Sequence, residues 1–159
     1  MATREEIVGA INQGIESVNQ TFGGLTDEQL ATEVYENGWT AKEILAHLAG
    51  RQSTYDMVLH MARGGEMPQS ADGDFDVDSW NQQVVDEYSG KSRDELLSQF
   101  RTVHESLAEQ VKDLDDDTLA ATVVTPRGEM PASDILVGSG GMHSTAHSND
   151  VAEALGLNS

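Results

Sequence analysis

Two histidines near the end of the chain, His143 and His147, have a spacing that suits metal binding. Residues four apart in a helix lie one turn apart on the same face, so both imidazoles can reach one ion. Metalloproteases use a histidine pair with this spacing, together with a glutamate placed between the two ligands. Here residues 143–147 read HSTAH and contain no acid. The pattern therefore indicates a metal site and argues against a protease of that type.

A third histidine, His47, can complete such a site. On a helical wheel it lies at the flank of an apolar stripe formed by its neighbours, from which it can point inward. Burying several imidazoles is unfavourable unless something pairs with their nitrogens. Three histidines plus water form a known open catalytic arrangement for zinc. The alternative is that these histidines only bond carbonyls or carboxylates in the core.

The remaining candidates have weaker positions. His60 lies on the face of its predicted helix opposite the apolar stripe, so we expect it in water with no role. His104 lies at the edge of an apolar stripe and is interpreted as a structural or surface histidine, with membership of the metal site as the alternative. Asp150 follows His143 by two turns on the same face, where it is an ordinary solvated carboxylate, an additional ligand, or a group that orients a ligand without binding the metal itself.

Four helices must position these residues. Four starts are marked by a Ser or Thr followed three residues later by Glu or Gln, the capping box. A fifth start is marked by Pro131, which suits the first turn of a helix. Apolar periodicity behind these starts predicts long helices over about 3–21, 40–63, 92–114 and 131–155. We therefore expect an all-α four-helix bundle. The capping boxes are Thr3 with Glu6, Thr26 with Gln29, Thr40 with Glu43, and Ser92 with Glu95.

The connections carry further expectations. The long acidic stretch 65–90 contains a short helical segment at about 77–87, between the second and third helices. The stretch 115–130 contains the β-branched residues 122–125, which predict a short extended segment or a hairpin. Gly138, Gly140 and Gly141 precede the histidine pair and either permit close helix approach or break the fourth helix.

Composition limits the classes of function. The 159 residues suit one domain, expected to span 1–159, and their net charge of −19 disfavours nucleic acid and anionic membranes as partners. An acidic surface is also explained by solubility, or by a salty or hot habitat. The chain has no cysteine, which excludes disulfides and thiolate ligands. With no stretch long enough to span a membrane and no secretory signal, we expect a cytoplasmic protein.

Three segments resemble a known family. Residues 38–48 (GWTAKEILAHL) resemble the second-helix motif of the DinB/YfiT-like superfamily, whose later HxxxH is matched by His143 and His147. Residues 76–81 (DVDSWN) and 91–97 (KSRDELL) are similar to the N-terminal branch of mycothiol-dependent maleylpyruvate isomerases. This resemblance implies a four-helix bundle, often a homodimer, with His47, His143 and His147 as metal ligands.

The resemblance also implies an activity. In that superfamily a metal activates a low-molecular-weight thiol for isomerisation or S-transfer, or supports hydrolysis. The chain ends soon after the fourth predicted helix, so we do not expect the isomerase's additional C-terminal domain, nor maleylpyruvate isomerisation itself. Histidine ligands suit several divalent metals, of which we expect zinc, with nickel, iron, cobalt and manganese as alternatives.

The leading hypothesis is thus an enzyme for a small-molecule substrate, whose pocket we expect to be lined by Trp39, Tyr55, Trp80 and Asn81. No catalytic acid or base can be named beyond the metal-bound water. One alternative is a non-catalytic protein that binds a metal or ligand and protects the cell. Another is a helical dimerisation module whose histidines are structural.

Overall fold

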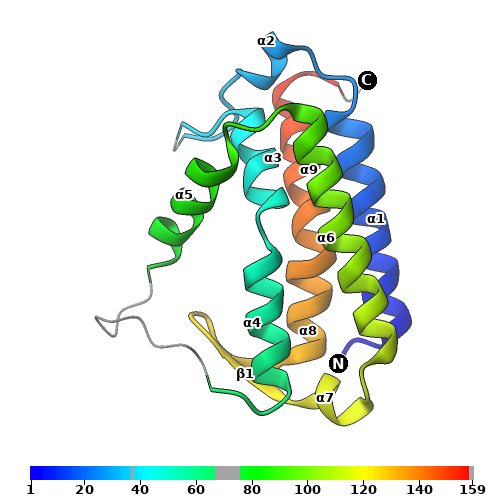
Figure 1. Ribbon diagram of the computed structural model, residues 1–159. Coiled ribbons are helices and arrows are strands. Elements are labelled where there is room, and N and C mark those ends of the chain that lie inside the picture. Colours follow the sequence, from blue (N-terminus) through cyan, green and yellow to red (C-terminus); the bar gives the residue numbers. More distant parts are fainter. Residues whose placement is uncertain (37, 67–75, 158–159) are drawn as a thin grey trace.

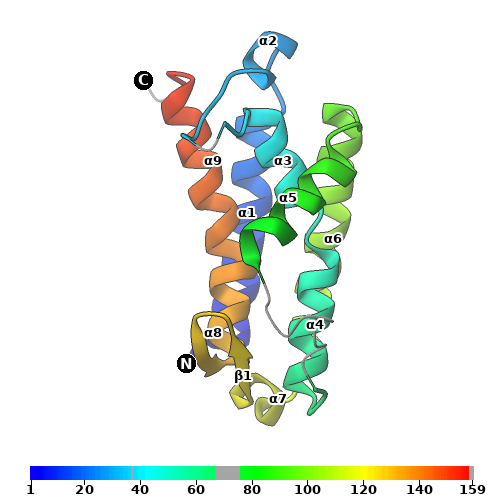
Figure 2. The same ribbon diagram turned by 90° about the vertical axis from the view of Figure 1, so that its left-hand side faces the viewer.

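The computed structural model describes residues 1–36, 38–66 and 76–157. Four long arms run side by side along the molecule (Figures 1 and 2). They are α1 (Arg4–Phe22), the pair α3 (Ala41–Ala49) and α4 (Gln52–Ala62), α6 (Arg93–Asp113), and a last arm made of α8 (Ala132–Val137), a π-helical turn η1 (Gly138–Met142) and α9 (His143–Ala154). The predicted four-helix bundle is confirmed.

The four predicted capping boxes all form. In α1, α3 and α6 they begin long arms of the bundle, because the cap side chains satisfy backbone N–H groups that have no partner within the helix. The box at Thr26 begins only one turn, α2 (Asp27–Leu30). Local capping chemistry therefore fixes where most arms start.

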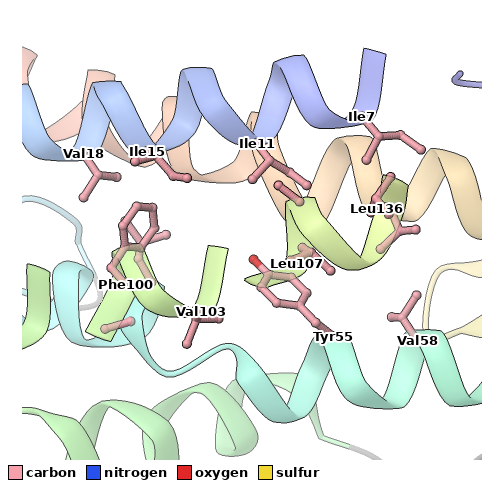
Figure 3. Packing of buried hydrophobic residues seen from close by; sticks show 14 of the residues in the cluster. Ile7, Ile11, Ile15, Val18, Tyr55, Val58, Phe100, Val103, Leu107 and Leu136 are labelled. Atoms are coloured by element: carbon pink, nitrogen blue, oxygen red, sulfur yellow. The ribbon is translucent and has the colours of Figure 1, made fainter. Parts of the chain in front are cut away.

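The core lies along the inner face of α1. The side chains of α1 at positions 7, 11, 15 and 18 point toward α6, α4 and α8 (Figure 3). The periodicity of these positions is the one that the sequence predicts for a core-facing helix. Shared burial of apolar side chains from all four arms holds the bundle together. The residues labelled in the close-up are Ile7, Ile11, Ile15, Val18, Tyr55, Val58, Phe100, Val103, Leu107 and Leu136.

The second arm differs from prediction. The sequence predicts one helix over 40–63, but the arm is broken at Gly50 and Arg51 into α3 and α4. At the break, α5 (Val77–Tyr88) packs against the backbone: a Cβ on Gly50 would lie 2.3 Å from Cγ1 of Val84. The break leaves Arg51 between the two helices.

Of the two expectations for the glycines of the fourth arm, close helix approach is confirmed, and a π-helical turn interrupts the α-helix without breaking the arm into two. Residues 138–142 form a π-helical turn, so the arm is not one regular α-helix. The same turn packs closely on α1, since a Cβ on Gly141 would lie 2.4 Å from the backbone carbon of Ala10. Glycine permits this approach, and the π turn sets the direction in which α9 leaves it.

The remaining elements close the ends of the bundle. The predicted short helix is α5, which lies against α3 (Figure 1). After α6 come the short α7 (Asp116–Ala120) and an antiparallel hairpin of β1 (Thr122–Thr125) and β2 (Gly128–Pro131), with Val123 opposite Met130. The hairpin is therefore the form that the β-branched segment takes. Among the described helices, none is long and apolar enough to cross a membrane.

Candidate metal centre

Three histidines from two arms meet between α3 and α9. Nε2 of His143 lies 3.2 Å from Nε2 of His47 and 3.0 Å from Nε2 of His147. One ligand atom from each residue lies within 4.8 Å of the other two. The predicted convergence of these histidines is therefore present in the fold, although His47 and His143 are 96 positions apart in the chain.

Burial keeps these imidazoles neutral. It lowers the pKa of His47 to about 3, and it also lowers the pKa values of His143 and His147. The charge of Arg51 lowers all three further. At neutral pH each ring is consequently available as an uncharged nitrogen donor.

The arrangement suits a cation better than hydrogen bonds among the rings alone. Three facing Nε2 atoms cannot all be satisfied by one another, and Nδ1 of His143 is buried without a hydrogen-bond partner. Tetrahedral zinc with N–Zn bonds of 2.0–2.1 Å would separate its nitrogen ligands by about 3.3 Å. The two short N···N distances are close to that value. The donor set therefore fits a divalent metal.

A tyrosine links one histidine to a carboxylate. The Tyr35 hydroxyl oxygen lies 2.7 Å from Nδ1 of His147, and the hydroxyl donates a hydrogen bond to Asp150. Because the tyrosine proton is given to Asp150, the tyrosine oxygen accepts from Nδ1–H of His147. That leaves the lone pair of His147 on Nε2, facing the other two rings. Asp150 thus reaches the site through Tyr35, which sequence reasoning did not identify.

Comparison of the sequence with models of protein families identifies its family. Residues 11–152 match the model of the mycothiol maleylpyruvate isomerase N-terminal domain. The chain belongs to this family. The resemblance seen in residues 38–48, 76–81 and 91–97 is thereby confirmed, together with membership of the DinB-like superfamily. No curated protein matches the sequence.

Solved structures share the fold of this family member at low identity. YfiT from Bacillus subtilis, described as a probable metal-dependent hydrolase with an unusual four-helix bundle topology, has a TM-score of 0.70 at 17% identity; the match covers 96% of this chain and 87% of YfiT. An uncharacterized protein from Clostridium difficile 630 has a TM-score of 0.72 at 17% identity, over 96% and 95% of the two chains.

The mycothiol-dependent maleylpyruvate isomerase has a TM-score of 0.68 at 20% identity, over 99% of this chain. This member of the family spans 62% of the isomerase's length. At these identities the likeness shows the shared fold.

Of the four residues expected to line a substrate pocket, Trp39 lies against the three-histidine cluster. Its ring is 5.2 Å from that of His47, and its Nε1 donates a hydrogen bond to Gln82 of α5. Trp80 and Asn81 lie half-buried in the first turns of α5. Trp39 therefore connects the three-histidine cluster to α5, while a pocket lined by all four remains a prediction.

The fourth expected pocket residue, Tyr55, is buried and bonds a different histidine, His104. Its hydroxyl lies 2.8 Å from Nε2 of His104 and 3.1 Å from the carbonyl oxygen of Ser139. His104 is fully buried, stacks on Phe100, and donates from Nδ1 to the Phe100 carbonyl. Of the interpretations left open for His104, the structural one is correct. His60 is exposed, as expected.

Arg51 is the second neighbour of the cluster that sequence reasoning missed. Its guanidinium donates to the Ser139 hydroxyl and lies 5.4 Å from the centre of the Tyr55 ring. Ser139 precedes His143 by four residues, and Arg51 follows His47 by four. This spacing was a usable signal, since residues four apart lie on one side of a helix.

Proposed function

We propose that the chain is a metal-dependent enzyme in which Nε2 of His47, His143 and His147 holds one divalent cation. The observation that carries this proposal is the convergence of three neutral Nε2 atoms, two pairs of which are 3.2 and 3.0 Å apart. Three neutral ligands leave the full positive charge on the ion and leave a coordination position for a small molecule.

The residues of the chain prepare this site in distinct ways. Tyr35 and Asp150 fix the tautomer and ring orientation of His147. The Trp39 ring packs against His47, which is itself 4% exposed. His143 and His147 are only half-buried, so a small molecule can approach the cluster from their side.

The reaction follows from what such a centre supplies. A divalent cation bound here lowers the pKa of a water or thiol that joins it, which gives a nucleophile at neutral pH. We propose hydrolysis or a thiol-dependent transfer or isomerisation of a small molecule, with zinc as the metal. The family match and the descriptions of YfiT as a metal-dependent hydrolase and of the isomerase as mycothiol-dependent support these two reaction classes.

The test is metal content first and activity second. Protein purified without a polyhistidine tag and reconstituted with zinc should contain about one equivalent by elemental analysis. His143→Ala should bind less than about one-tenth of that amount, whereas His60→Ala, which removes an exposed histidine, should match the wild type. Wild-type protein with less than about one-tenth equivalent of any divalent metal would overturn the proposal.

Activity separates an enzyme from a protein that only binds a metal or ligand. Screens with activated esters and with low-molecular-weight thiols should detect turnover that is lost in His143→Ala and retained in His60→Ala. Turnover that survives in His143→Ala would contradict catalysis at this centre. A homodimer, implied by the family resemblance, is part of the proposal and can be measured by sedimentation.

A further inference from the structure

Arg51 lies at the junction of the elements that carry the three histidines. It occupies the break between α3, which bears His47, and α4. Its guanidinium donates to Ser139 of η1, the turn that leads directly into His143. The Arg51 side chain is thus attached to both of the arms between which the three-histidine cluster lies.

The charge of Arg51 has no counterion within the described part of the chain. The sequence contains 28 acidic and 9 basic residues, so acidic partners are abundant. Four ion pairs form among the described residues, and they involve Arg4, Arg93, Arg101 and Lys112. Arg51 instead contacts a hydroxyl and an aromatic ring, and its buried Nε has no hydrogen-bond partner.

This arrangement is unfavourable for the free protein. A partly buried guanidinium without a carboxylate keeps part of its desolvation penalty, and an unmet donor adds to it. Arg51 follows His47 by four residues and contacts Ser139, which precedes His143 by four. Its charge therefore lies near the histidines whose proposed role is to bind a cation, and it repels that cation. A negatively charged group placed between Arg51 and the cation would relieve both penalties at once.

We propose that Arg51 is a carboxylate-binding residue of this site, and that the substrate carries a carboxylate which the guanidinium holds beside the cation on His47, His143 and His147. This inference rests on the proposed function and adds a substrate class to it. The planar guanidinium presents parallel N–H donors that match the two oxygens of a carboxylate. Its contacts with Ser139 and Tyr55 hold the donors in place before a ligand binds.

The proposal makes opposite predictions for metal and for anion. Arg51→Met removes a positive charge beside the cation, so zinc should bind as tightly as in the wild type or more tightly. The same variant should bind acetate at least about tenfold more weakly, because the charged hydrogen bonds are lost. A residue that only braced α3 against η1 would show the reverse for zinc, since its loss would loosen the ligands.

The experiment uses zinc-loaded protein, with acetate as the probe and neutral acetamide as its isosteric control. Acetate affinity is measured by titration calorimetry in the wild type and in every variant. In proteins that keep Arg51, the arginine Nε–H resonances are also followed by proton–nitrogen correlation spectra, in which Arg51 is assigned by its absence in Arg51→Met. Zinc affinity is measured separately by competition with a chromophoric chelator. Arg51→Lys keeps the positive charge but lacks the parallel N–H donors of the guanidinium. Arg101→Met removes an exposed arginine on α6 and serves as the charge-matched control.

We expect acetate, and not acetamide, to shift the Arg51 resonance in a saturable manner. Arg101→Met should behave as the wild type, and Arg51→Lys should bind acetate with intermediate affinity. Two results would overturn the inference without affecting the metal site. In one, the Arg51 resonance of zinc-loaded protein does not shift with acetate; in the other, Arg51→Met binds acetate as tightly as the wild type does. Failure of the wild type to take up metal would overturn the proposed function itself, and this inference with it.

Discussion

Tyr35 and His147 lie 112 residues apart in the chain, yet the phenol oxygen of one is 2.7 Å from Nδ1 of the other. Tyr35 stands in the connection between α2 and α3, and His147 in the second turn of α9. Since the phenol proton is given to Asp150, His147 must donate from Nδ1 and present a lone pair on Nε2. Burial, assisted by Asp150, raises the pKa of Tyr35, so the phenol stays protonated and this direction of donation persists.

Replacement of Tyr35 by phenylalanine should therefore weaken metal binding. Tyr35→Phe leaves Nδ1–H of His147 without an acceptor and frees the ring to rotate or change tautomer. Loss of such a supporting group typically lowers metal affinity by about 10–100-fold. Zinc dissociation constants from chelator competition check this expectation.

The matched control for Tyr35→Phe is Tyr88→Phe. Tyr88 lies on α5 with its ring 5.9 Å from the Lys91 ammonium, and its hydroxyl is not linked to the histidines. This variant should bind zinc like the wild type. Equal zinc affinity in Tyr35→Phe and the wild type would show that Tyr35 does not orient His147.

Removal of metal should lower thermal stability. A ligand that binds only the folded state at 100 times its dissociation constant stabilises it by about 2.7 kcal/mol. For a chain of this size that corresponds to roughly 5–10 °C in Tm. Calorimetry with zinc and with excess chelator should show this difference in the wild type and in His60→Gln, and none in His143→Gln. A chelator-independent Tm for the wild type would favour a purely structural role for the three histidines.

The parts of this site that follow local rules could be predicted from the sequence. The spacing of His143 and His147 places them on one helix face whatever the rest of the chain does. Capping boxes likewise fix helix starts within a few residues, and the box at Thr40 sets the phase in which His47 points inward. These inferences need no knowledge of distant segments.

The parts that depend on distant segments were missed. The helix expected over 40–63 breaks at Gly50, where Val84 and Tyr88 of α5 pack against the backbone. No residue near Gly50 in the sequence indicates that α5 packs there. Tyr35 lies outside any periodic segment, so no wheel assigns it a face. The sequence could not decide which role His104 has, because its partner Tyr55 lies 49 residues away.

The burial of His104 makes the metal-free protein sensitive to acid. Burial lowers the pKa of His104 to about 4, whereas an unfolded chain titrates near 6.5. Between these values the unfolded state binds more protons, so stability falls as the pH decreases from about 6.5 to about 4. The loss from this residue amounts to about 3 kcal/mol at the acid end.

Urea unfolding of metal-free protein at pH 7 and pH 4.5 measures this effect. His104→Gln is expected to be less stable at pH 7, because Tyr55 and Phe100 lose a partner that bonds both, but its stability should change less between the two pH values. His60→Gln controls for the loss of an exposed histidine. Equal pH dependence in His104→Gln and the wild type would exclude His104 as a source of the acid sensitivity.

The approach of η1 to α1 gives the sharpest test of the fold around the site. Gly141→Ala would place a Cβ 2.4 Å from the backbone carbon and 2.6 Å from Cβ of Ala10, which neither helix can avoid by rotating a side chain. Separation of the two backbones should destabilise the protein by about 1–3 kcal/mol. Since α9 follows η1 directly, the same shift should move His143 and His147 away from His47 and weaken zinc binding.

Gly138→Ala is the control within the same turn. A Cβ at Gly138 meets nothing within 4 Å, and its backbone is already right-handed helical. Because alanine favours the helix over glycine by up to about 1 kcal/mol, this variant should be neutral or more stable in urea, with unchanged zinc affinity. If Gly141→Ala proved as stable and as able to bind zinc as Gly138→Ala, close contact between η1 and α1 could not be what sets the position of the histidine pair.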